Sequence, residues 1–190
     1  TYEKTNGALT QATNFFQKSG HFSEAFQILR LLLERGMTLS KIIEELIDCA
    51  DKLNILDTCA DILAELATKH PDDATLLNYT SGLMGTLGRK KESILFGNMA
   101  AASKPFFASS RKDAKLRMLV LQCTAAGDYR YSPHSKRFFM PGISDLYTLL
   151  DPGISSHRLL VDDLPAALAA LNSLPPCDLV FNAISDPDYE

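Results

Sequence analysis

The 190-residue sequence has no tryptophan and no long hydrophobic run. No apolar stretch approaches the roughly 18 residues that a membrane-spanning helix needs, so the sequence predicts no contact with a membrane interior. The net charge of −4 provides no overall attraction to nucleic acid or to anionic lipid. With 46% hydrophobic and 22% charged residues, the composition is typical of a globular protein and not of a disordered one.

The motifs of common catalytic sites are also missing. The sequence contains no GxxxxGK[ST] phosphate loop, no GxGxxG, no GxSxG and no HExxH. Its four histidines are far apart along the chain. We therefore predict no catalytic residue, no cofactor and no metal site within these residues.

The four cysteines form no CxxC pair. Cys49 and Cys59 lie on apolar helical faces and Cys123 follows an apolar run, which is typical of small buried hydrophobic residues. This pattern favours thiols in a reducing compartment, and a cytoplasmic protein, over the alternative of structural disulfides.

What the sequence does contain is a set of residue types that recurs at one fixed interval. Small residues stand at Ala25, Cys59 and Ser93, and a glycine or asparagine lies five positions before each of them. Other matched columns are Phe16, Ala50 and Met84; Leu29, Leu63 and Gly97; and Met37, Pro71 and Pro105. The period of these columns, 34, is the length of one helix–turn–helix unit in a helical solenoid.

Within each unit the apolar spacing predicts two helices. The predicted pairs cover about residues 6–18 and 22–35, then 42–50 and 57–69, then 76–87 and 94–103, with Asp57 expected to cap the fourth helix. The small column predicts close approach of the paired helices, since a larger side chain would push them apart. A generic antiparallel helical bundle is the alternative.

The repeated unit resembles the tetratricopeptide repeat. The residues that carry this resemblance are the small column, the turn residues Gly20 and Gly88, the aromatic or bulky residues Phe16, Phe22 and Met84, and the unit ends Pro71 and Pro105. It covers three units over about residues 5–105. Met37 in place of proline, Lys90 in place of an aromatic residue, and the absence of tryptophan depart from the family pattern.

After Pro105 the pattern changes to short apolar strands separated by helices. Residues 118–121, 157–161 and 177–184 read as strands, and residues 144–150 and 165–174 as helices, with residues 129–142 as a polar loop. This β-α-β-α-β order predicts a small Rossmann-like α/β subdomain with a three-stranded parallel sheet. Such a sheet would have an open edge, so we expect the chain to continue past Glu190 or another element to cover the edge.

The second half resembles the opening subdomain of ATP-grasp proteins. The matching stretches are Leu116–Asp128 and Cys177–Asp188. The nucleotide-binding lysines and metal-binding Glu and Asn residues of that family would lie beyond Glu190, so the resemblance implies no catalysis here. The predicted organisation is a helical repeat domain over residues 1–108 and an α/β subdomain over residues 114–190.

Two groups of residues are candidate sites. The first helices of the three units should line a concave face for a peptide or protein partner, formed by Thr10, Asn14, Gln17, Lys41, Glu44, Asp48, Asp51, Thr75 and Asn78. The loops at the carboxyl ends of the predicted strands form a possible ligand loop, with Gly127, Asp128, Asn182, Asp186 and Asp188.

We therefore expect a scaffold that recruits a protein or peptide through its repeats. The alternative is the substrate-recruiting start of an ATP-grasp ligase or a nucleotide-sugar glycosyltransferase. Oligomeric state does not follow from the sequence.

Overall fold

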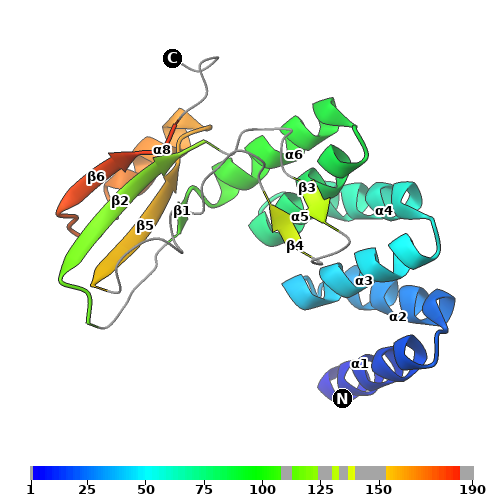
Figure 1. Ribbon diagram of the computed structural model, residues 1–190. Helices are drawn as coiled ribbons and strands as arrows, with labels where there is room; N and C mark the ends of the chain where they lie inside the picture. Colours follow the sequence, from blue (N-terminus) through cyan, green and yellow to red (C-terminus); the bar gives the residue numbers. More distant parts are fainter. Residues whose placement is uncertain (1, 108–112, 124–129, 133–136, 140–152, 185–190) are drawn as a thin grey trace.

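The structure is a computed structural model that describes residues 2–107, 113–123, 130–132, 137–139 and 153–184. Six helices lie within the first of these ranges: α1 (Tyr2–Lys18), α2 (Phe22–Glu34), α3 (Ser40–Lys52), α4 (Leu56–Lys69), α5 (Ala74–Thr86) and α6 (Lys90–Ser103). A helical array followed by a small α/β unit confirms the predicted fold class (Figure 1).

The repeat period sets the helix boundaries. Helix α5 begins and ends one full period after α3, and α6 begins one full period after α4. One local expectation was wrong: Ile55 is the N-cap of α4, so Asp57 lies in the first turn instead of capping it. An acidic side chain in the first turn still interacts favourably with the helix dipole.

Each pair of helices reverses direction through the same turn. Gly20, Asn54 and Gly88 have backbone φ angles of 77°, 56° and 75°, the left-handed region that glycine adopts without steric cost. In each turn the next residue donates its N–H five positions back, from His21 to Phe16, Ile55 to Ala50 and Arg89 to Met84, at 2.9 Å in all three. This is the hydrogen bond of a Schellman motif, and it occurs within each of the three helix pairs. Gly36, with a φ angle of 82°, forms a further one after α2, where the Met37 N–H donates to Leu32 O at 3.1 Å.

The small column is fully buried. Ala25, Cys59 and Ser93 each have 0% exposure, as the sequence predicts. Each lies within the second helix of its unit. Beside it is a continuous core that extends across the helical half and contains leucines from the first and the second helices of the units. Overpacking at this column would therefore disturb neighbouring helices as well.

In the third unit the close approach of α5 and α6 involves two serines. Ser81 Oγ donates to Ser93 O at 2.7 Å, and Ser93 Oγ donates to Ser81 O at 2.8 Å, so both buried hydroxyls are satisfied. A Cβ at Gly97 would lie 3.2 Å from Ser81 Oγ, which explains a small residue there. These contacts give the glycine-rich third unit a tight helix pair.

The helices form two layers. The first helices of the units are linked by Gln17 Nε2, which donates to Cys49 Sγ at 3.5 Å, and by Tyr79 Oη, which donates to Glu44 Oε1 at 2.5 Å. These bonds join α1 to α3 and α3 to α5, so the three helices lie side by side. We call this the first-helix layer, and α2, α4 and α6 the second-helix layer.

The α/β half contains strands β1 (Phe106–Phe107), β2 (Leu116–Gln122), β5 (Ile154–Leu160) and β6 (Leu179–Asn182) and helix α8 (Leu164–Leu171). In the described residues the sheet order is β1-β5-β2-β6, with β5, β2 and β6 parallel and β1 antiparallel to β5. Asp163 caps α8, its carboxylate accepting from Ala166 N at 2.8 Å. The three parallel strands match those predicted from the sequence, and β1 is an additional strand.

Strand β1 joins the two halves directly. It follows closely after α6, and Pro105 O accepts a hydrogen bond from Leu160 N at 2.7 Å. The Phe106 ring packs against the buried His157 ring, with centroids 5.7 Å apart. Helix α8 also contacts α6. The sheet therefore begins where the last repeat ends.

A second, unexpected element is a hairpin of β3 (Arg130–Ser132) and β4 (Arg137–Phe139), within the segment predicted as a loop. Strand β3 contacts α5, and Figure 1 shows the hairpin beside this helix of the first-helix layer. The predicted helix at residues 144–150 lies outside the described residues.

The buried small column generates the first prediction. Cys59→Arg would place a large charged side chain between closely packed helices, so we expect a loss of about 3 kcal/mol or more in the free energy of unfolding, measured by urea denaturation. Thr58→Arg introduces the same side chain at the exposed neighbouring position and should cost less than about 1 kcal/mol. Equal stability of the two variants would contradict the proposed packing.

Candidate partner-binding face

The predicted concave residues lie on the first-helix layer. Asn14 and Lys41 are exposed, and the other seven are partly exposed: Thr10, Gln17, Glu44, Asp48, Asp51, Thr75 and Asn78. Their spacing repeats with the units, since Thr10, Glu44 and Asn78 share one column and Gln17 and Asp51 share another. The sequence therefore places a set of polar side chains on one layer of the array.

Several of these side chains are already held in place. Glu44 accepts the Tyr79 hydroxyl, Gln17 donates to Cys49, and Asp48 forms an ion pair with Lys52 at 2.8 Å. Lys52 Nζ also lies 4.6 Å from the centre of the Phe22 ring. These contacts limit the rotamers of the groups that a partner would meet, which lowers the entropy lost on binding.

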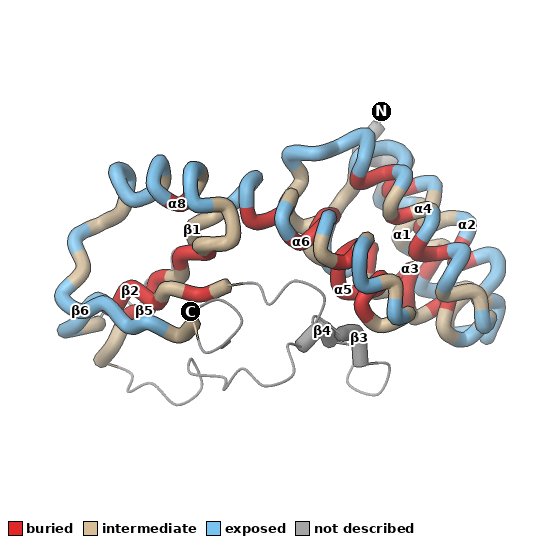
Figure 2. Tube along the Cα trace, turned by 90° about the horizontal axis from the view of Figure 1, so that it is seen from above, coloured by how far each residue is buried: buried red, intermediate tan, exposed pale blue. Residues whose placement is uncertain are grey.

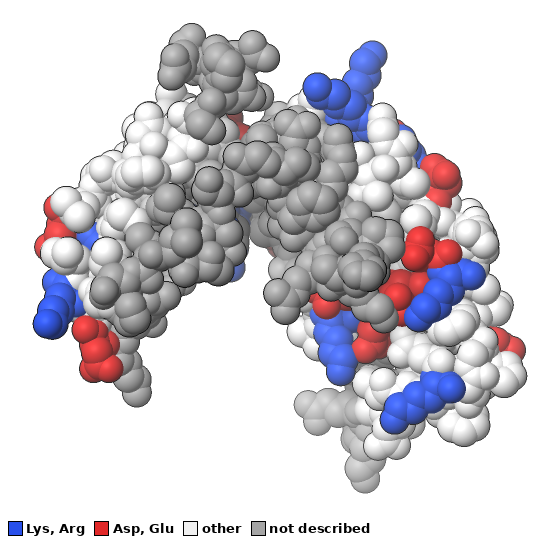
Figure 3. Space-filling view, in the orientation of Figure 1, with Lys and Arg blue, Asp and Glu red and all other residues white. Residues whose placement is uncertain are grey.

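Acidic side chains predominate on α3. Glu44, Glu45, Asp48 and Asp51 lie along it, and Lys41 and Lys52 lie near its two ends, with Lys41 3.8 Å from Glu45. Figure 3 shows this gathering of acidic groups over α3 with basic groups beside it. The face therefore carries a local negative charge that would favour basic side chains in a partner.

The third unit presents a different surface. The residues one repeat period after Asp48 and Asp51 are Gly82 and Gly85, and both are buried. Since β3 contacts α5, an extended segment of the same chain lies against this helix.

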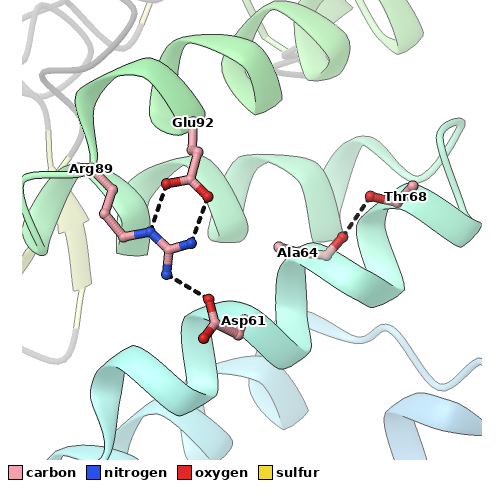
Figure 4. A network of polar contacts seen from close by, with 5 residues as sticks. All are labelled: Asp61, Ala64, Thr68, Arg89 and Glu92. Carbon is pink, nitrogen blue, oxygen red and sulfur yellow. Dashed lines mark hydrogen bonds and ion pairs between the residues drawn. The ribbon is translucent and has the colours of Figure 1, made fainter.

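The second-helix layer has its own link between units, shown in Figure 4. Arg89 donates to Glu92 through Nε and Nη2, at 2.7 and 2.5 Å, and through Nη1 to Asp61 on α4 at 2.6 Å. The Arg89 guanidinium holds the pKa of Glu92 below its usual value. Ion pairs at such an exposed surface contribute little to stability, so this link adds only a small part of the energy that holds the two units together.

A polar cleft of about 530 Å³ opens at the ends of the helices, and no motif in the sequence predicts it. It is lined by Gly36, Thr38, His70, Asp72, Asp73, Ala74, Thr75, Ser103 and Lys104. Among the predicted site residues that the structure describes, only Thr75 lines it. Ser103 Oγ donates to Asp72 O at 2.7 Å across one side. The cleft comes from loops of different units, and their meeting depends on the solenoid geometry.

The possible ligand loop is only partly described. Gly127, Asp128, Asp186 and Asp188 lie outside the described residues. Asn182 ends β6, and its Oδ1 accepts from Ile184 N at 3.0 Å, which is a local turn contact.

Nucleophilic chemistry is disfavoured at the cysteines of the helical half. Burial raises the pKa of Cys59 to about 12, with a smaller contribution from nearby Cys49, whose own pKa is raised chiefly by burial. Both thiols are therefore protonated at neutral pH and shielded from solvent. All four cysteines are described, and none is in a disulfide.

Within the described part of the chain, no group of three or more His, Cys, Asp or Glu side chains is arranged to hold a metal ion. No helix in that part combines the length and apolar character needed to cross a membrane. Comparison with known protein-family models gives no match, and comparison with curated proteins gives none either.

Thiol accessibility tests this description of the cysteines. With Ellman's reagent the native protein should expose at most two reactive thiols, at the partly exposed Cys123 and Cys177, and four in urea. The expectation follows from complete burial of Cys49 and Cys59. Rapid reaction of more than two thiols in the native protein would show that the helical core is open.

Proposed function

We propose that this protein recruits an extended peptide or protein segment on its first-helix layer, and that its helical half is a repeat module of the tetratricopeptide type. The repeat period, the left-handed turn in each unit and the buried small column support the family assignment. The free thiols support a reducing compartment such as the cytoplasm.

The observation that carries the proposal is the position of β3. An extended segment of this chain lies against α5, the first helix of the third unit. In the first two units the positions that match Gly82 and Gly85 of α5 carry polar side chains. Asn14 on α1 is exposed, and Gln17 on α1 and Asp48 and Asp51 on α3 are partly exposed. We infer that an incoming segment lies along α1 and α3, beside the hairpin.

The partner should be basic where it meets α3. Asp48 and Asp51 are one helical turn apart, and Glu44 lies one turn before Asp48. This spacing suits a segment with several lysine or arginine side chains, which would meet acidic groups in turn. Such pairs at a partly exposed surface improve specificity and association rate more than affinity.

A second candidate function concerns the α/β half. In the order β5-β2-β6, strand β2 lies in the middle. The chain passes from β2 to β5 on one side of it and then crosses to β6 on the other side, so the strand order reverses at β2. In open α/β sheets such a reversal marks a ligand crevice at the carboxyl ends of the strands. This observation favours the start of an ATP-dependent ligase or nucleotide-sugar transferase, for which the repeats would deliver substrate.

Selection from a random peptide display library tests the recruiting function. We expect enriched peptides to be rich in lysine and arginine and to lose about tenfold or more in affinity with Asp51→Lys, because the reversed charge repels them. Affinity would be measured by fluorescence anisotropy at fixed ionic strength, since such contacts are salt-dependent.

Glu24→Lys is the matched control, because it reverses a charge at an exposed position of α2 in the second-helix layer. The affinity of the Glu24→Lys variant for the enriched peptides should stay within about twofold of the parent's affinity, once the change in net charge is corrected for. Failure to enrich any peptide, or equal effects of the two reversals, would contradict the proposal.

A further inference from the structure

Two buried side-chain polar atoms of the described residues have no hydrogen-bond partner: Gln122 Oε1 and His157 Nδ1. Both residues are more than nine-tenths buried, with exposures of 4% and 5%. Buried acceptors in native proteins are nearly always paired, because an unpaired one has lost its bonds to water without replacement. Each of these atoms is therefore a polar group that the described fold does not satisfy.

Gln122 lies at the place in the sheet where a ligand is expected. It is the last residue of β2, the middle one of the three parallel strands, and its O accepts from Val161 N at 3.0 Å. The strand order reverses at β2, and open α/β sheets bind ligands at the carboxyl ends of strands beside such a reversal. His157 lies instead within β5, against the Phe106 ring. Of the two residues, only Gln122 combines an unpaired atom with a position of this kind.

The strand register shows which side chains share the face of the sheet that Gln122 occupies. Val120 shares it, because residues two apart on a strand point to the same side. Phe181 on β6 is level with Val120, and Leu160 on β5 is level with Gln122. Figure 2 shows most of β2 buried and the neighbouring β6 exposed, and 42% of Phe181 is accessible. The amide therefore lies at the end of an apolar surface that includes one accessible aromatic ring.

The space between the amide and this ring is lined by a small residue. The Ala183 N–H donates to Leu121 O at 2.9 Å, which continues the register of β6 and makes Ala183 level with Gln122. With strands about 4.8 Å apart and about 6.6 Å between alternate residues, the Cα atoms of Phe181 and Gln122 are about 8 Å apart. A planar ring that contacts Phe181 can therefore reach the Gln122 amide past the alanine methyl group.

The charges at the strand ends do not suit a phosphate group. The described residues there, 122–123, 160–163 and 182–184, include no lysine or arginine, and Asp162 and Asp163 are acidic. A glutamine amide presents an acceptor and a donor side by side. It matches a ligand edge that has an N–H beside an acceptor, as in the pairing of glutamine with adenine, and bases stack on aromatic side chains.

We propose that Gln122 binds the base of a nucleoside at the carboxyl end of β2, with the base stacked on Phe181. The base donates an N–H to Gln122 Oε1 and accepts from Nε2. Adenine provides this pair at its amino group and a ring nitrogen, and uracil at N3–H and a carbonyl oxygen. The inference rests on the second candidate function, in which adenine corresponds to an ATP-dependent ligase and uracil to a transferase that uses a uridine nucleotide.

Titration of the full chain with adenosine and with uridine, followed by NMR, tests the proposal. Nucleosides are used because the described strand ends offer no phosphate contact. We expect one of the two to bind. Its matched control is N6,N6-dimethyladenosine or 3-methyluridine, which keeps the ring but lacks the N–H donor and should bind at least about tenfold more weakly.

Gln122→Leu keeps the size of the side chain and removes the amide. The affinity for the nucleoside should fall about tenfold or more, while the free energy of unfolding stays the same or rises, because an unpaired buried acceptor is removed. A purely structural role of Gln122 would instead lower the stability. Gln27→Leu, at an exposed position of α2, is the control and should keep the parent's affinity.

The outcomes separate this inference from the functions on which it depends. Nucleoside binding that Gln122→Leu leaves unchanged would overturn the role of Gln122 but not the second candidate function. Binding of neither nucleoside would overturn both. Recruitment of basic peptides by the first-helix layer is measured independently, and Gln122→Leu should leave it unchanged.

Discussion

The helical half depends on one backbone constraint, a single residue in the left-handed conformation between the helices of each pair. Gly20, Asn54 and Gly88 provide it once per repeat, and each is followed by the same hydrogen bond back to the first helix. The backbone conformation and the hydrogen bond of the turn are therefore repeated in all three units. The small residues Ala25, Cys59 and Ser93 are fully buried at the matching position of each second helix, and one core extends through all three units.

The stacking of units adds contacts that no unit has alone. In the first-helix layer the links are Gln17 with Cys49 and Glu44 with Tyr79, and in the second-helix layer Arg89 with Asp61. The array ends without a long linker, because Phe106 enters the sheet shortly after α6 and packs on His157. The proposed recruiting face therefore lies on helices that contacts between the units hold in place.

Much of this architecture could be predicted from the sequence, since it depends on local pattern. The repeated columns predicted the helix pairs and the buried small residues, and short apolar runs predicted the strands that begin at Leu116, Ile154 and Leu179. Strand β1 could not be predicted, because two phenylalanines have no period and their pairing with β5 joins segments far apart along the chain. The β3–β4 hairpin was read as a loop because its segment lacks apolar alternation. The cleft near Thr75 depends on loops from separate units.

Asn54 offers the most direct test of the central claim, because it is the one turn residue of the three that is not glycine. Left-handed backbone costs a non-glycine residue about 1–2 kcal/mol, and β-branched residues tolerate it least. Urea denaturation of Asn54→Gly and Asn54→Val measures that constraint. The account predicts that Asn54→Gly matches or exceeds the parent in free energy of unfolding, while Asn54→Val loses about 1–2 kcal/mol. If both variants lost stability equally, or neither did, the left-handed turn would not be the constraint on which the repeats depend.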